Sequence, residues 1–139
     1  MSTPSRTAPS CNIALASDAS TLSLAVQTLV NGGLVAIPTE TVYGLSASIN
    51  NEDAIAKIFM VKGRPQNHPL IVHIANIDEL QTVAVDIHHD AIKLAHACWP
   101  GPLTLLLQRN ENVSMSITGG RDTVAVRIPD NAFTRQLIL

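Results

Sequence analysis

The sequence is poor in aromatic and charged residues, and both shortages limit what the protein can be. Phe, Trp and Tyr make up 3% of the 139 residues, so the core has to be built from aliphatic side chains. Charged residues make up 14% and the formal net charge is −2, which excludes attraction to nucleic acid by overall charge. A local basic patch is still compatible with this balance, because Lys62, Arg64, Arg121 and Arg127 can meet in space although they are distant in sequence.

Cysteines and long apolar runs are also scarce. Cys11 and Cys98 are too few for a disulfide framework, and Cys98 falls on the apolar side of an expected helix, which predicts a buried side chain. No apolar run approaches the ~18 residues of a transmembrane helix. The Ser/Thr/Pro-rich residues 1–10 lack the apolar stretch of a signal peptide. These absences predict a cytoplasmic protein without a membrane segment.

The elements that the sequence does contain predict an α/β fold. With 46% apolar residues, the chain matches one domain, which we expect over residues 18–139 after a disordered lead-in over residues 1–17. Helical spacing of apolar residues predicts a helix stopped by Gly32-Gly33, then helices at residues 51–61, 78–83 and 86–99 and one capped by Asp130 or Asn131. Strands are expected at residues 34–37, 70–74, 103–108 and 123–128, the first of them central because it is fully apolar. Residues 41–47 are expected to form a short helix or turn. Strands that alternate with helices are typical of the α/β class.

Hydroxyl groups follow the first expected strand directly. Proline cannot donate to a sheet ladder, so this strand should stop at Pro38. Thr39 and Thr41 come next, at the carboxyl end of the strand, which is where open α/β sheets bind ligands. The alternative is that these hydroxyls only cap the following turn.

Two cations stand one residue apart after the next expected helix. Lys62 and Arg64 lie on a loop bounded by Gly63 and Pro65, and a rigid pair of cations suits a phosphate or a carboxylate. The alternative is a solvated pair that complements the helix C-terminus.

Two polar residues lie inside apolar strands. His73 in such a place is more often a satisfied core histidine than a ligand. Arg127 needs an anionic partner, because burying it unpaired costs on the order of several kcal/mol. The sequence offers Asp130, Asp122 or the carboxylate of a ligand for this role.

The histidines do not predict a metal site. His89 and His96 are seven residues apart on one helix face, and the neighbouring His88 and His89 are expected to point apart. The sequence also has no P-loop and no Ser-His-Asp or Cys-His set, so a covalent nucleophile is not predicted.

Taken together, five motifs resemble the Sua5/YciO/YrdC family, in order and in spacing, over about residues 18–139. They are Pro38-Thr39-Glu40-Thr41-Val42-Tyr43-Gly44-Leu45, Lys62-Gly63-Arg64-Pro65, Pro69-Leu70-Ile71-Val72-His73-Ile74, Trp99-Pro100-Gly101-Pro102-Leu103-Thr104 and Val124-Ala125-Val126-Arg127-Ile128-Pro129. The resemblance implies a twisted, mixed sheet with flanking helices around a concave cavity.

The resemblance also implies an activity, that of an L-threonylcarbamoyladenylate synthase. Such a nucleotidyltransferase combines L-threonine, bicarbonate or CO2, and ATP with Mg²⁺, and releases pyrophosphate. Its product would feed the threonylcarbamoyl-transferase machinery that modifies adenosine 37 of tRNA. By motif, Thr39, His73 and Arg127 match threonine-binding positions. The nucleotide-binding positions are matched by Lys62, Arg64, Gln66 and Thr123, of which Lys62 and Arg64 are also the catalytic candidates.

One family segment does not occur in this sequence. The ATP-binding Ser-Ala-Asn-x-Ser-Gly segment is absent, so we expect a domain that is incomplete at its C-terminal side, inactive alone and prone to self-association. Two alternatives stay open. One is a non-catalytic YrdC-like module that binds double-stranded RNA or a nucleotide. The other is a carbamoyl-transfer domain of the hydrogenase-maturation type, which should carry zinc-finger and acylphosphatase-like segments that residues 1–17 are too short to hold.

Overall fold

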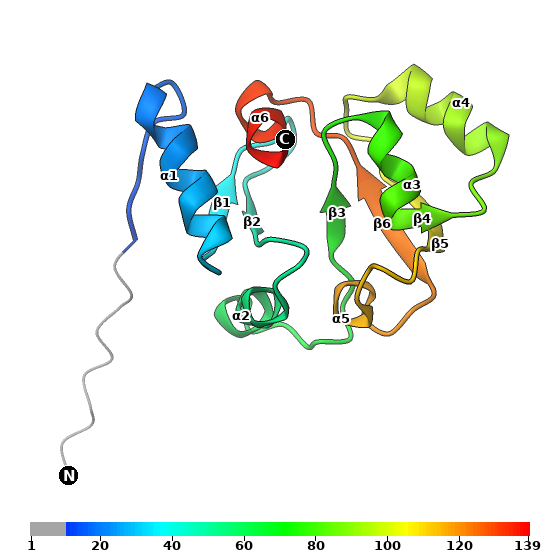
Figure 1. Ribbon diagram of the computed structural model, residues 1–139, viewed down its shortest axis with the longest axis horizontal. Helices are drawn as coiled ribbons and strands as arrows, with labels where there is room; N and C mark the ends of the chain where they lie inside the picture. Colours follow the sequence, from blue (N-terminus) through cyan, green and yellow to red (C-terminus); the bar gives the residue numbers. More distant parts are fainter. Residues whose placement is uncertain (1–10) are drawn as a thin grey trace, which may run out of the picture.

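The computed structural model describes residues 11–139 and has a mixed α/β architecture, with helices around two small sheets (Figure 1). Of the expected lead-in, residues 1–10 lie outside the described part, and residues 11–17 carry no helix or strand. The elements follow in the order α1 (Ala19–Val30), β1 (Val35–Ile37), β2 (Gly44–Ser46), α2 (Glu52–Lys62), β3 (Ile71–His73), the 3-10 turn η1 (Ile77–Glu79), α3 (Leu80–Val83), β4 (Ala84–Val85), α4 (His89–Cys98), β5 (Leu105–Arg109), α5 (Met115–Thr118), β6 (Thr123–Arg127) and α6 (Ala132–Ile138).

The larger sheet has four strands in the order β3-β6-β5-β4. Strand β3 runs parallel to β6, whereas β5 is antiparallel to both of its neighbours. The parallel register pairs His73 with Arg127, so the carboxyl ends of β3 and β6 lie side by side. This pairing brings two of the expected site residues together.

The smaller sheet corrects two expectations. Strand β1 is not central, because within residues 11–139 it pairs only with β2, antiparallel. Ile37 of this strand is buried instead in a cluster with Ala25 of α1 and Leu137 of α6, while Val35 is partly buried and Ala36 is exposed. The segment 41–47, expected as a short helix or turn, contains strand β2, which Ser46 helps to fix by donating its hydroxyl to the Val35 carbonyl at 2.7 Å.

Helix ends follow the local signals of the sequence. The Asn51 side chain caps α2 by accepting from the Ala54 amide at 3.0 Å, and Gly63 ends the helix at a left-handed φ of 62°. Asn131, not Asp130, caps α6 by accepting from the Thr134 amide at 3.1 Å. The buried face of α2 has the helical spacing that predicted this element, and it consists of Ala54, Ile55, Ile58 and Phe59.

The main core is aliphatic, as the composition predicts. It packs α2, α3 and α5 against the four-stranded sheet and includes one aromatic residue among its buried members. These members are Ile55, Phe59, Val72, Ile74, Leu80, Val83, Ala84, Val113, Ile117, Val124, Val126 and Ile128.

Helix α4 contradicts the expectation for Cys98, which is exposed. Ala95 is buried on this helix, and Ile92 and Trp99 pack partly against the core. Cys98 is the last residue of α4 and lies outside the face that these three residues form. No helix within residues 11–139 is long and apolar enough to cross a membrane.

Candidate ligand-binding site around Arg127

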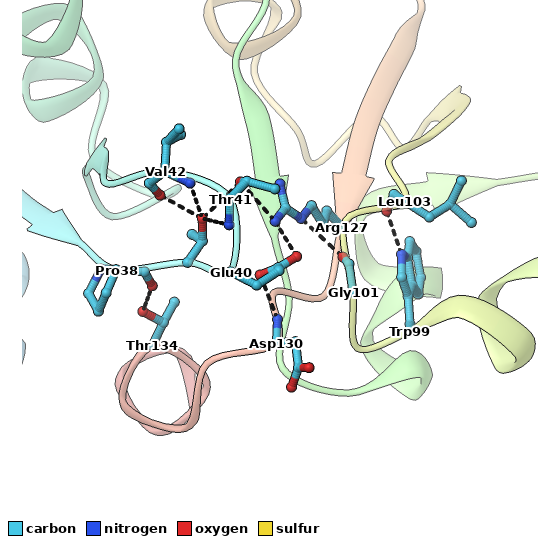
Figure 2. A network of polar contacts seen from close by, with 11 residues as sticks. Pro38, Glu40, Thr41, Val42, Trp99, Gly101, Leu103, Arg127, Asp130 and Thr134 are labelled. Atoms are coloured by element: carbon cyan, nitrogen blue, oxygen red, sulfur yellow. Dashed lines mark hydrogen bonds and ion pairs between the residues drawn. The ribbon is translucent and has the colours of Figure 1, made fainter.

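Arg127 is the centre of a polar network at the carboxyl end of β6 (Figure 2). Its side chain is 9% exposed and its guanidinium donates through two nitrogens. Nε donates to the Gly101 carbonyl at 3.1 Å, while Nη2 donates to Glu40 and, at 3.2 Å, to the Thr41 hydroxyl. The predicted anionic partner therefore exists, but it is Glu40 and neither Asp130 nor Asp122.

Glu40 is held by both of its carboxylate oxygens. Oε1 accepts from Arg127, and Oε2 accepts from the backbone amide of Asp130 at 2.9 Å. Burial raises the pKa of Glu40, but backbone hydrogen bonds and the Arg127 guanidinium outweigh burial and hold the pKa below its ordinary value. Glu40 is thus a carboxylate at neutral pH, and it neutralises the charge of Arg127.

Thr39 organises the turn between β1 and β2. Its hydroxyl accepts from the Thr41 and Val42 amides at 3.2 and 3.1 Å and donates to the Val42 carbonyl at 2.6 Å. Thr39 therefore caps this turn. Because the Thr39 proton is used on Val42, the 3.0 Å contact between the two hydroxyls takes its proton from Thr41. A chain of hydrogen bonds links Thr39 through Thr41 to Arg127.

His73 completes the group on the neighbouring strand. Burial, followed by the positive charge of Arg127, lowers the pKa of His73, although the Ile71 backbone and Glu40 act in the opposite direction. The imidazole is therefore neutral at pH 7. The structure brings Thr39, His73 and Arg127 to one place.

Contacts between distant parts of the sequence hold this site in shape. The Thr134 hydroxyl of α6 donates to the Pro38 carbonyl at 2.5 Å, and Asp130 donates to Glu40 in the segment before α6. Figure 2 shows that the turn after β1 lies against the end of β6 and the start of α6. The end of the first strand is thus fastened to the last helix.

The expected phosphate-binding residues lie elsewhere. Lys62, Arg64 and Gln66 are exposed at the end of α2 and in the loop that follows, and Thr123 begins β6. The loop leads to the starting end of β3, where the Leu70 amide donates to the Ile117 carbonyl at 2.7 Å. Arg127 lies at the other end of β6, which four residues of strand place roughly 13 Å away. The candidates therefore form two groups at opposite ends of two parallel strands.

The histidines of α4 correct one further expectation. His88 and His89 do not point apart: their ring centroids are 4.2 Å apart, and both contact Asp90. His88 is the extended N-cap and His89 the first helical residue, so the usual helical angle does not separate them. The ligand atoms of this exposed trio lie within 4.8 Å of one another. A helix N-terminus is nevertheless unfavourable for a cation.

Two hollows also lie beside α4. Their volumes are about 190 and 270 Å³, and they share Ile77 and His96 as lining residues. Neither of these two is lined by Arg127, Lys62 or Arg64. The concave cavity that the family resemblance implies stays a prediction.

Comparisons with known proteins identify the family to which this α/β chain belongs. The sequence model of the Sua5/YciO/YrdC family, described as "Telomere recombination", matches residues 27–139. The chain belongs to the Sua5/YciO/YrdC family.

Similar proteins agree with this membership. A threonylcarbamoyl-AMP synthase of Pyrococcus abyssi is 52% identical over 77% of this chain, and one of Bacillus subtilis is 46% identical over 76%. This chain spans only 32% and 31% of these two relatives, about a third of their length. The crystal structure of P. abyssi Sua5 complexed with L-threonine has a TM-score of 0.82 at 49% identity, covering 84% of this chain and 34% of that one. The structure of E. coli YciO, at 24% identity, shares the fold with a TM-score of 0.75 over 84% of this chain and 57% of its own.

Sequence reasoning did not find the role of Glu40. The residue lies inside the first family motif, between the two hydroxyl residues that were singled out. The available signal was a buried arginine that needs an anion, together with an acidic residue beside a ligand-binding strand end. The two are 87 residues apart, so no local pattern connects them.

Proposed function

We propose that this chain forms the threonine-binding part of an L-threonylcarbamoyladenylate synthase. The observation that carries the proposal is the convergence of Arg127, the Thr39–Thr41 hydroxyls and His73 at one strand end. The names of the relatives, and a solved relative in complex with L-threonine, support the same assignment. The proposed reaction joins L-threonine, bicarbonate or CO2, and ATP.

In this proposal, Arg127 binds the carboxylate of threonine. Nη1 is the guanidinium nitrogen that has no hydrogen-bond partner within residues 11–139, so its donors are free for a ligand. The neutral imidazole of His73 can exchange a hydrogen bond with the amine or the hydroxyl of threonine. The positive charge of Arg127 and the imidazole of His73 thus fit the polar groups of an amino acid, and the Thr39–Thr41 hydroxyls hold Arg127 in place.

The nucleotide belongs, in the same proposal, to the other group of residues. Lys62 and Arg64 would bind the phosphates of ATP, with Gln66 and Thr123 beside them, and Mg²⁺ would be held chiefly by phosphate oxygens. An extended ATP molecule would reach along β3 and β6 toward Arg127. In this reaction the amine of threonine, once it has lost a proton to solvent, would attack CO2, and the resulting carbamic acid would release a second proton to become the carbamate. A carbamate oxygen would then bond to the α-phosphorus of ATP while the bond from that phosphorus to the bridging oxygen breaks, and pyrophosphate would leave. Positioning and charge stabilisation can support this nucleotidyl transfer without a covalent nucleophile.

The wider setting is also part of the proposal. The product would pass to threonylcarbamoyl-transferase machinery in the cytoplasm for modification of adenosine 37 of tRNA. Contact with tRNA or with double-stranded RNA would then be transient.

Threonine binding gives the direct test. L-threonine should raise the melting temperature of this chain by mass action, with a shift that grows with the logarithm of concentration above Kd. Threoninol lacks the carboxylate and should give no shift, because it offers nothing to Arg127. Equal shifts from the two compounds, or none from threonine, would rule out this role for Arg127.

Pyrophosphate release distinguishes a synthase from a binding module. The assay combines the chain with L-threonine, bicarbonate and Mg-ATP. Release that requires all three substrates supports the synthase. Binding of threonine and ATP without release would show that this chain is a binding module and not by itself a synthase.

A further inference from the structure

The ion pair of Glu40 and Arg127 changes what Arg127 offers to a ligand. A guanidinium without protein partners can bind a carboxylate through two of its nitrogens. In the structure, Nε is taken by the Gly101 carbonyl and Nη2 by Glu40 and Thr41. One nitrogen, Nη1, is left without a partner within residues 11–139. A ligand carboxylate therefore meets a single donor nitrogen instead of a two-pronged fork.

Glu40, in contrast, has capacity to accept more. The two carboxylate oxygens together have about four lone-pair sites. Arg127, the Asp130 amide and the backbone amide of Glu40 itself use three of these sites, which leaves room for a further donor. The Glu40 side chain is 20% exposed, against 9% for that of Arg127. An additional donor can therefore reach the carboxylate from the solvent side.

The pair also sets the charge that a ligand meets. Glu40 and Arg127 sum to zero, and the neighbouring His73 is neutral at pH 7. A simple carboxylic acid gains little from such a pair, because the attraction of Arg127 is offset by the repulsion of Glu40. A zwitterionic amino acid gains from both charges, because Arg127 attracts its carboxylate and Glu40 attracts its ammonium. The two groups are attached to the same carbon, so they can reach these neighbouring side chains together.

We propose that Glu40 is a specificity-determining residue of this site, which receives the α-ammonium group of the bound amino acid while Arg127 takes its α-carboxylate. The site then selects amino acids over hydroxy acids of the same shape. This inference rests on the proposed function, because it takes threonine as the ligand. It adds a residue to the site and gives a chemical basis for the selection.

Calorimetric titration with two ligands tests the proposal. L-threonine carries the ammonium group, whereas 3-hydroxybutyrate keeps the carboxylate and the hydroxyl but lacks the ammonium. The wild-type chain should bind L-threonine at least about tenfold more tightly, as expected for one charge-assisted contact. Glu40→Gln should weaken threonine binding by about tenfold and leave 3-hydroxybutyrate unchanged or improved, so the preference disappears.

Asp130→Asn is the matched control. Asp130→Asn also removes one negative charge, from a residue next to Glu40. Asp130 contacts Glu40 through its backbone amide, and Figure 2 shows the Asp130 carboxylate pointing away from the Glu40–Arg127 pair. This variant should keep the preference for threonine.

If Glu40→Gln does not fold, Glu40→Asp provides the second variant. It keeps the negative charge but retracts it by one methylene, so it should weaken the binding of threonine more than the binding of 3-hydroxybutyrate.

The outcomes separate this inference from the proposed function. If Glu40→Gln weakens both ligands by the same factor, Glu40 only positions Arg127 and the inference is wrong, although the threonine site stands. The same conclusion follows if the wild-type chain binds both ligands equally. If the wild-type chain binds neither ligand, the threonine site itself is wrong and the role of Glu40 falls with it.

Discussion

Three neighbouring side chains at the end of β3 and β6 carry different charges for different physical reasons. Arg127 is positive because a guanidinium is always protonated in proteins, and Glu40 and the Gly101 carbonyl accept its hydrogen bonds in a buried place. Glu40 stays negative because hydrogen bonds and Arg127 outweigh its burial. His73 is kept neutral, because a second positive charge beside Arg127 would be both buried and repelled. The charge states of Glu40 and His73 therefore both depend on Arg127.

This dependence predicts how stability varies with pH. The pKa of His73 in the folded chain lies below the ordinary value of 6.5, so just under pH 6.5 the unfolded chain binds the proton more readily. The free energy of unfolding should therefore fall as the pH is lowered from 7.5 through that window, and level off below the folded pKa. Glu40 stays ionised throughout, because its own pKa lies below 4.5. Denaturant unfolding between pH 7.5 and 5.5 measures the effect.

His73→Gln should show a flatter pH profile than the wild-type chain, because glutamine does not titrate. His96→Gln is the control, since His96 is exposed on α4. If the wild-type and His73→Gln profiles have the same slope, the pH dependence arises from other groups.

At the scale of elements, the sequence predicted what local chemistry determines. Asn51 and Gly63 mark the ends of α2, and Asn131 marks the start of α6, because caps act within one turn of their own position. Strands β2 and β4 were missed, since they have three and two residues and exist only through pairing with a partner strand.

The same limit applies to the candidate site. The sequence identified Arg127 and the two hydroxyls from residue type and from strand ends. It could not choose the partner of Arg127, because that choice depends on how the turn after β1 folds back onto β6. Asp130 was a reasonable candidate by distance in sequence, yet it contributes its backbone amide to Glu40.

The position of the loop after α2 depends on Gly119, the glycine at the end of α5. Gly119 ends α5 at a φ of 61°, and a methyl group there would meet the Asn67 carbonyl oxygen and lie 2.6 Å from Arg121 Nη1. The same Arg121 nitrogen donates to the Asn67 carbonyl at 2.9 Å. Gly119 thus permits a close approach that fixes the loop between Lys62 and Leu70.

We therefore expect Gly119→Ala to destabilise the chain more than Gly63→Ala does. Gly63 is a matched control, since it also ends a helix at a φ of 62° but has open space around it. Both substitutions cost about 1–2 kcal/mol for the left-handed backbone. Gly119→Ala should lose about 1–3 kcal/mol more through overlap with the Asn67 backbone. Denaturant unfolding gives both values, and equal losses would show that the loop moves aside at little cost.

On the scale of the whole molecule, the four-stranded sheet has an open side. Strand β3 is at one end of the order β3-β6-β5-β4, and within residues 11–139 it pairs only with β6. Ile71 on this strand is 46% exposed. An edge strand with free backbone groups and an exposed aliphatic side chain is a template for pairing with another chain. Figure 1 shows β3 in the middle of the molecule, facing the separate β1–β2 sheet.

This open edge predicts self-association of the 139-residue chain. The weight-average sedimentation coefficient should rise with protein concentration, and Ile71→Lys should reduce the rise, because a charge on an edge strand opposes strand pairing. Leu106→Lys is the control: Leu106 is 69% exposed but lies on β5, inside the strand order, where it pairs with Ala125 of β6. A larger effect of Leu106→Lys would assign the association to the face of the sheet. A wild-type chain that sediments as a monomer at all concentrations would show that β3 is not used for pairing.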